Sequence, residues 1–327
     1  MQLIINSYGA YLHRRGDRFA VKSEEKVAEV AADKVETILI TTSATLSTDA
    51  VALALERNVD IVFLDKFGDP MGRVWHSKLG STTQIRRWQL KAEETPEGFA
   101  LALGFVVRKA EQQIEFMKDL KKNRQDRSDE FAEVIENMKA LLSELRVLKG
   151  TGKDLRERVM GIEGIISRKY FGILSSSLPK KWQFAGRSRD PAKDEFNAML
   201  NYGYGVLYSH VERGCIIAGL DPYIGILHTD NYNKKSFVFD FIEIFRVYID
   251  RTVMNLIIKR QVKESYFDII PGGVYLNKKG KVVLLTALNE MFEQKVKVGR
   301  RTMTLRSAIP LACHHVANQL LEGAQMR

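Results

Sequence analysis

The hydrophobic pattern of the chain changes its period near residue 82, and this change most restricts the folds open to it. Before that point, short runs such as VETILIT and DIVFLD are rich in Val, Ile and Phe and predict buried strands. After it, FAEVIENMKALLSELRVL spaces its apolar residues helically from Phe131 to Leu148, which predicts an amphipathic helix. We therefore expect an α+β protein with a β-rich N-terminal domain, residues 1–80, followed by an all-α domain, residues 81–327.

Turn and capping signals predict three further elements. The sequence RGD at residues 15–17 separates two apolar runs and predicts a hairpin turn. STDAVALALERN predicts a short helix capped by Ser47 or Thr48. IIPGGVYLNKKGKVVLL, residues 269–285, predicts a small β-hairpin inserted among helices.

The positive charge of the chain is concentrated after residue 80. The formal net charge is +10, and residues 1–80 hold 10 Lys and Arg against 11 Asp and Glu. Residues 81–327 hold 40 against 29, a net charge of +11. A domain this basic predicts a polyanionic partner, of which nucleic acid is the commonest. A protein that is merely basic would show the same charge, so charge alone leaves both interpretations open.

Length and composition exclude several classes of protein. A chain of 327 residues exceeds one ordinary hydrophobic core, and 45% hydrophobic with 28% charged residues is typical of soluble proteins. No apolar run of about 18 residues predicts a membrane span, and the N-terminus does not have the pattern of a signal peptide. Cys215 and Cys313 fit no metal spacing, so we expect reduced thiols in a cytoplasmic protein.

Two acidic residues lie inside one of the most apolar segments, SFVFDFIEIFR. Asp240 and Glu243 are three residues apart, so on a helix they would share a face. Two buried like charges repel, so one should be protonated or should meet a cation. Arg246, three residues beyond Glu243, would supply that cation in a salt bridge, and a divalent metal ion is the alternative. Asp250 and Arg251 are interpreted as a surface pair.

A histidine and a glutamate elsewhere offer further ligands. His228 ends the apolar run GLDPYIGILH, and Glu163 borders a helical apolar stripe two turns before Tyr170. The simpler interpretations are a satisfied core histidine and a glutamate at the rim of a helix. A neutral imidazole with two or three carboxylates would suit Mn²⁺ or Mg²⁺, and it lacks the sulfur ligands of a structural zinc site.

Four segments follow one another in a set order: GIEG with the later Tyr170, GRSRDPAKDEFNAMLNYGYGVL at 186–207, AGLDPYIGILH at 218–228 and FDFIEIFR at 239–246. Together they resemble the signatures of the CRISPR-associated adaptation integrase, the metal-dependent DNA endonuclease that inserts new spacers into CRISPR arrays. ILITTSATLSTDAVALALERNVDIVFLDKFGDPMGRV resembles the family's N-terminal domain, so the resemblance covers nearly the whole chain. It implies a β domain that pairs in a homodimer and an all-helical catalytic domain.

The resemblance also implies the residues of the site. Glu163, His228 and Asp240 correspond to the family's metal ligands, for Mg²⁺ or Mn²⁺, and Glu243 to a further catalytic acid. Four basic residues are expected to contact DNA phosphates: Arg187, Arg189, Lys193 and Arg246. For the first three, a solvated basic loop is the alternative. Three residues are expected to support the site by hydrogen bonding or packing: Tyr170, Asn201 and Tyr204.

The activity implied by the resemblance is metal-dependent transesterification. The 3′-hydroxyl of a short DNA duplex would attack a phosphodiester of the CRISPR repeat, and water in its place would give nuclease activity. The implied partners are double-stranded and branched DNA, a second copy of the chain, and a small ferredoxin-like CRISPR adaptation protein. A branched-DNA repair nuclease remains an alternative. A non-catalytic DNA-binding scaffold would explain the charge but not the buried acids. A metal hydrolase that acts on a small molecule would explain the acids but not the charge.

Overall fold

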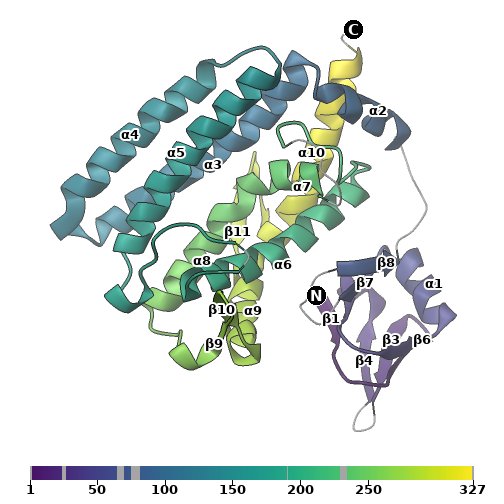
Figure 1. Cartoon of the computed structure of the whole chain (residues 1–327). Helices are drawn as coiled ribbons and strands as arrows, with labels where there is room; N and C mark the ends of the chain where they lie inside the picture. The colour runs from purple at the N-terminus through teal and green to yellow at the C-terminus, as the bar shows by residue number, and fades with distance from the viewer. Residues whose placement is uncertain are drawn as a thin grey trace. The chain divides into compact units, whose positions relative to one another are not determined.

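The chain forms two compact units, Met1–Gly80 and Ser81–Arg327, and each is described by itself (Figure 1). The computed structural model describes residues 2–23, 27–64, 70–74, 82–189, 191–228 and 234–325. Within these ranges the first unit is rich in strands and the second is helical apart from short hairpins and 3₁₀ turns. The predicted α+β class is confirmed.

The described strands of the first unit form two four-stranded sheets. One has the order β1-β5-β7-β8, in which β1, β5 and β7 are parallel and β8 is antiparallel to β7. The other has the order β4-β3-β2-β6. The strands are β1 Gln2–Ile5, β2 Ala10–Arg15, β3 Arg18–Lys22, β4 Val27–Ala31, β5 Thr37–Ile40, β6 Ala44–Leu46, β7 Asp60–Leu64 and β8 Pro70–Val74. The runs TILI and DIVFL, predicted as buried strands, are the parallel strands β5 and β7.

The turn and the helix predicted in this unit are confirmed. Arg15 pairs with Arg18 across the β2–β3 hairpin, and Gly16 between them adopts the positive φ that this two-residue turn requires. Helix α1, Thr48–Glu56, begins after Ser47, whose hydroxyl accepts a hydrogen bond from the backbone N–H three residues on.

Long helices form the frame of the second unit. Helices α3, α4 and α5 lie side by side (Figure 1), and the predicted apolar stripe of α4 is buried between Phe131 and Leu145. The helices are α2 Thr82–Ala92, α3 Pro96–Lys122, α4 Ser128–Val147, α5 Lys153–Ser176, α6 Glu195–Ile217, α7 Ser236–Phe241, α8 Arg246–Ile258, α9 Lys278–Glu293 and α10 Leu305–Gln325. Within the described residues, none of them combines the length and apolarity needed to cross a bilayer.

Two antiparallel hairpins lie among these helices. Their strands are β9 Phe267–Ile270, β10 Gly273–Leu276, β11 Lys295–Val298 and β12 Arg301–Thr304. The hairpin predicted at residues 269–285 is correct only in its first half. Asn277 caps α9 by accepting backbone hydrogen bonds, and Leu284 and Leu288 are buried at helical spacing, so the second half is helical.

Candidate active site

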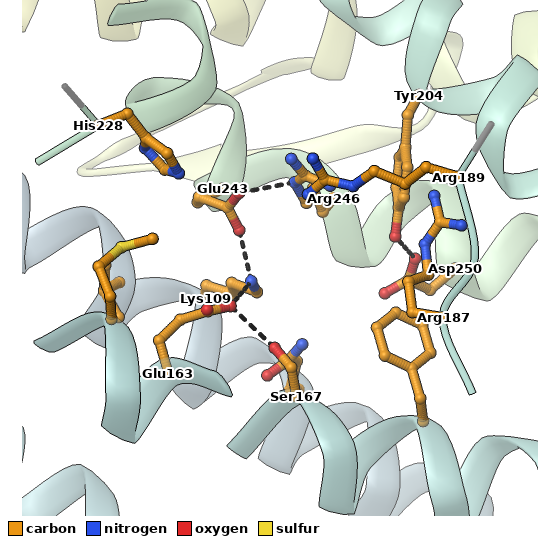
Figure 2. Close-up of a pocket in the computed structure, with 14 residues that line it drawn as sticks. Lys109, Glu163, Ser167, Arg187, Arg189, Tyr204, His228, Glu243, Arg246 and Asp250 are labelled. Carbon is orange, nitrogen blue, oxygen red and sulfur yellow. Dashed lines mark hydrogen bonds and ion pairs between the residues drawn. The ribbon is translucent and has the colours of Figure 1, made fainter. Parts of the chain in front are cut away.

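A cavity of about 200 Å³ lies in the second unit and is lined from α3, α5, α6, η4 (the 3₁₀ turn Ile242–Phe245) and α8. Charged and aromatic side chains from segments far apart in the sequence converge on it (Figure 2). Its polar and titratable lining residues include Lys109, Glu163, Ser167, Arg187, Arg189, Tyr204, His228, Glu243, Arg246 and Asp250. The structure therefore brings together six of the eight residues predicted to bind metal, act in catalysis or contact DNA, and leaves out Asp240 and Lys193.

Lys109 of α3 lies between two of the carboxylates (Figure 2). Its Nζ donates a hydrogen bond to Glu163 Oε1 and lies 2.6 Å from Glu243 Oε2. Burial lowers the pKa of Lys109, but the charges of Glu243 and Glu163 outweigh this effect and raise it. The cavity thus contains a buried, charged ammonium group.

Glu163 is held on α5 at the edge of that helix's buried stripe, as its spacing predicts. Its Oε1 accepts a second hydrogen bond from Ser167 Oγ at 2.8 Å, one helical turn further on. The side chain is 22% exposed, so Glu163 faces the cavity and solvent rather than the helix interface.

Glu243 stays ionised in spite of its burial. Burial raises its pKa, but the charges of Arg246 and Lys109 outweigh this effect and lower it to about 2. Arg246 Nε lies 2.8 Å from Glu243 Oε1, so the predicted salt bridge is present. The other oxygen, Oε2, is buried and lies 2.6 Å from Lys109 Nζ, so both oxygens of Glu243 face a cation.

Asp240 does not line the cavity. Its carboxylate is fully buried and accepts hydrogen bonds from the backbone N–H groups of Ile226, Leu227 and His228 at 2.7, 3.0 and 3.0 Å. The expectation that Asp240 faces a metal ion beside Glu163 and His228 does not match this placement. Helix α7 ends at Phe241 and gives way to η4, and the two acids three residues apart meet different partners.

The imidazole of His228 is oriented by the same carboxylate, because its Nδ1 lies 2.6 Å from Asp240 Oδ1. Burial lowers the pKa of His228, but the hydrogen bond and charge of Asp240 outweigh this effect and raise it. With Nδ1 engaged, Nε2 is the ring nitrogen left for a ligand in the cavity.

A buried hydrogen-bond network lies beside the charged cluster. Asp250 accepts hydrogen bonds from the hydroxyls of Tyr170 and Tyr204, both predicted as supporting residues. Burial raises the pKa of Asp250 to about 6. The interpretation of Asp250 and Arg251 as a surface pair is wrong, because Asp250 is 1% exposed and Arg251 pairs with Asp119.

The predicted phosphate-binding residues divide into two groups. Arg187, Arg189 and Arg246 line the cavity. Lys193 does not, and its Nζ instead donates to the carbonyl of Gly272 at the tip of the β9–β10 hairpin. Lys193 therefore ties that hairpin to the loop that carries the two arginines.

Asn201 of α6 positions those two arginines. Its side-chain carbonyl accepts from Arg187 Nη2 at 2.6 Å, and its amide donates to the backbone carbonyl of Arg189. Asn197 binds the same guanidinium at 2.7 Å, and Arg187 also lies over the ring of Tyr204. The predicted supporting residue Asn201 thus acts on the basic loop rather than on the carboxylates.

Sequence reasoning missed Lys109 and the burial of Asp250. Lys109 occupies the buried face of α3 with Val106 three residues before it and Gln113 four residues after it. A charged residue on an otherwise buried stripe is a signal that a partner charge lies opposite. Asp250 carries the same signal, since Ile249 and Val253 on either side of it are buried.

The donor types around the cavity fit a hard divalent ion. Glu163 and Glu243 offer carboxylate oxygens and His228 offers Nε2, a mixed set that suits Mn²⁺ or Mg²⁺. Glu243 Oε2 is buried and faces Lys109, and a divalent ion in the place of that ammonium would satisfy the same oxygen. Within the part of the chain that is described, no three His, Cys, Asp or Glu side chains are already grouped to hold an ion. The ammonium of Lys109 stands between the two carboxylates.

Comparison with known proteins gives three kinds of match. Residues 3–290 match the family model described as CRISPR associated protein Cas1. CRISPR-associated endonuclease Cas1 1 of Archaeoglobus fulgidus is 34% identical over 329 residues, covering 97% of this chain and 95% of that protein. A casposase bound to integration product shares the fold with a TM-score of 0.81 at 22% identity, covering 98% of this chain and 91% of that one. A chain of a Cas6-RT-Cas1–Cas2 complex also shares the fold, with a TM-score of 0.76 at 21% identity. The match covers 99% of this chain and 35% of that one.

Proposed function

Because the chain belongs to the Cas1 family of CRISPR-associated proteins, we propose that it is a DNA endonuclease and integrase of CRISPR spacer acquisition. The A. fulgidus relative is named as an endonuclease, which supports the nuclease part of this proposal. The observation that carries it is the convergence of Glu163, His228 and Glu243 on one cavity that Arg187 and Arg189 also line. Acidic ligands beside basic phosphate-binding groups are what phosphoryl transfer on DNA requires.

We propose that Glu163, His228 and Glu243 hold a divalent ion, Mg²⁺ or Mn²⁺, and that Asp240 supports them. When bound, the ion would stabilise negative charge that develops on the phosphate oxygens. Asp240 would keep the proton of His228 on Nδ1, so that the lone pair of Nε2 faces the cavity. The three backbone N–H groups that bind Asp240 fix the loop from which His228 projects.

The arginines supply the binding of DNA. Asn201 holds the guanidinium of Arg187 and the backbone of Arg189, so the Arg187 guanidinium loses little freedom when it binds phosphate. In the proposed reaction, a 3′-hydroxyl of a DNA end attacks a phosphodiester of the CRISPR repeat, and the strand that leaves takes the proton. No nucleotide cofactor is needed, because one phosphodiester bond forms as another breaks.

The proposed partners follow the same reasoning. The Cas6-RT-Cas1–Cas2 complex contains a chain of this fold, which supports a small ferredoxin-like CRISPR adaptation protein as the partner. Two insertions on opposite strands need two sites at a fixed distance, which supports a homodimer as the minimal unit. We propose that this assembly acts on double-stranded and branched DNA in the cytoplasm.

Strand transfer on a branched DNA that mimics a half-integrated spacer tests the proposal. We expect joining with Mn²⁺ or Mg²⁺ and none with chelator. Glu163→Gln and Glu243→Gln should abolish it, whereas Glu115→Gln, an exposed acid on α3, should not. Joining that persists in Glu163→Gln would contradict the assigned site. Hydrolysis of the branch without joining would favour the alternative of a repair nuclease.

A further inference from the structure

Lys109 forms ion pairs with the two carboxylates that the proposed function assigns to a metal ion. Lys109 is 7% exposed, and its ammonium contacts Glu163 and Glu243 at the same time (Figure 2). The lysine comes from α3, whereas the acids come from α5 and from η4. One side chain therefore links three elements through a single buried charge.

The acids have few other partners. Glu163 otherwise receives a hydrogen bond from Ser167, which carries no charge. Glu243 is paired with Arg246 through Oε1, but its Oε2 faces Lys109. Without Lys109, Arg246 would be the one cation in contact with Glu163 or Glu243 among the described residues, an arrangement that burial disfavours.

We propose that Lys109 is the resident cation of this cavity: it holds Glu163 and Glu243 in place in the metal-free protein, and a divalent ion must displace it in order to bind. This inference rests on the proposed function, since it concerns the same carboxylates. Two cations repel each other strongly at contact distance in a buried site, so they compete for the oxygens. Lys109 is thus a positioning residue that stabilises the metal-free state and weakens the affinity for metal.

Removing the charge of Lys109 should therefore lower the stability of the metal-free protein and raise its affinity for metal. Lys109→Met keeps an unbranched side chain, one atom shorter, but leaves the carboxylates without their ammonium. We expect Mn²⁺ to bind the variant at least about tenfold more tightly in calorimetric titration, because nothing has to be displaced. In chelator, its unfolding midpoint should fall by roughly 5 °C or more, because a buried ion pair has lost one partner.

Lys118→Met is the matched control. Lys118 lies on the same helix, 43% exposed, and pairs with Glu115. It should change neither the Mn²⁺ affinity nor the unfolding midpoint. If Lys109→Met does not fold in chelator, Lys109→Gln keeps a hydrogen-bond donor without the charge, and it should also bind Mn²⁺ more tightly than the wild type.

Equal or weaker Mn²⁺ affinity in both Lys109 variants would overturn the inference. Glu163→Gln, titrated in parallel, separates this failure from a failure of the proposed function. If Glu163→Gln abolishes Mn²⁺ binding while the Lys109 variants bind as the wild type does, the metal site stands and the displacement does not. If no protein, variant or wild type, binds Mn²⁺ in a Glu163-dependent way, both proposals fail.

Discussion

At Asp240, four hydrogen-bond donors from three successive residues meet one carboxylate. The Asp240 carboxylate holds the backbone of residues 226–228 in place, and its link to the site is the hydrogen bond with the His228 ring. Glu163, by contrast, is partly exposed and faces the cavity, and among the described residues it contacts Lys109 and the uncharged Ser167. Acids that look alike in sequence therefore have different physical roles, and substitutions can separate them.

Replacing Asp240 by Asn should damage both the fold and the site. An amide presents one acceptor oxygen instead of two and turns N–H groups toward backbone N–H groups. We expect the free energy of unfolding to fall by about 2–4 kcal/mol and the Mn²⁺ affinity to fall 10- to 100-fold. Urea denaturation in chelator and Mn²⁺ titration measure the two effects.

Glu163→Gln should abolish Mn²⁺ binding but lower the free energy of unfolding less than Asp240→Asn does. The loss is smaller because Lys109 keeps Glu243 as its counter-ion. Unchanged stability in Asp240→Asn would contradict the structural role of that carboxylate.

The raised pKa of Asp250 predicts a pH dependence of stability. Burial raises this pKa from 3.8 to about 6, so between these values the native protein holds a proton that the unfolded chain releases. Stability should therefore fall as pH rises through this window, by about 3 kcal/mol in full above pH 6. Asp250→Asn removes this dependence, so its stability relative to the wild type should rise between pH 4 and pH 7. Urea denaturation across that range tests this, and a pH-independent difference would contradict it.

Part of this site could be predicted from sequence. Glu163 and His228 stood out because a charged group bordered or ended an apolar run, and Glu243 because it lay within one. Lys109 could not be paired with them, because its partners lie 54 and 134 residues away and only the packing of α3 against α5 and η4 brings them together. The different roles of Asp240 and Glu243 depend on the change from α7 to η4, for which residue spacing gives no signal.

Between elements, the contact of α6 with α8 sets the geometry behind the cavity. Gly203 of α6 lies so close to α8 that an added Cβ would stand 2.6 Å from Cγ2 of Ile249, which is itself buried. The next residues on each helix, Tyr204 and Asp250, are hydrogen-bonded to each other. The small side chain at Gly203 therefore permits the contact that positions this network.

Gly203→Ala should separate the two helices. We expect a loss of about 1–3 kcal/mol in the free energy of unfolding, because the buried Ile249 has little room to move. Gly205→Ala on the same helix is the control: no described residue lies within 4 Å of an added Cβ, so it should stabilise by about 0.5–1 kcal/mol. Thermal or urea denaturation compares them. Equal effects of the two substitutions would show that helix propensity, not packing, decides the outcome.

The elements that local signals predict are present, except for one, and that exception has a physical reason. The 3.6-residue period of α4 and α5 and the capping Ser47 of α1 each predicted an element that is present. The second half of the segment 269–285 was mistaken for a strand because VVLL favours strands locally. The cap at Asn277 and the burial of Leu284 against the helical core outweigh that preference.

Over the whole molecule, charge divides with the fold. The strand-rich unit is nearly neutral and the helical unit carries a net charge of +11, with its cavity lined by Arg187 and Arg189. The change of hydrophobic period near residue 82 falls at the division between the units. If this charge binds DNA, the DNA affinity should depend on the salt concentration.

DNA binding should weaken steeply with salt, with the logarithm of the affinity falling linearly with that of the salt concentration. If Arg189 binds a phosphate as proposed, Arg189→Gln should reduce that slope by about 1. Lys118→Gln, on an exposed part of α3, should leave it unchanged. Fluorescence anisotropy with a branched DNA at several salt concentrations measures the slopes. Identical slopes for Arg189→Gln and the wild type would remove Arg189 from the DNA interface.

The position of Mn²⁺ in crystals of the protein tests the central claim most directly. We predict one anomalous peak in the cavity, bounded by Glu163, Glu243 and Nε2 of His228, with Lys109 moved away from the two carboxylates. Asp240 should still bind the backbone N–H groups of the 226–228 loop. A peak on Asp240, or no peak with Lys109 still between the carboxylates at saturating Mn²⁺, would contradict the proposed site.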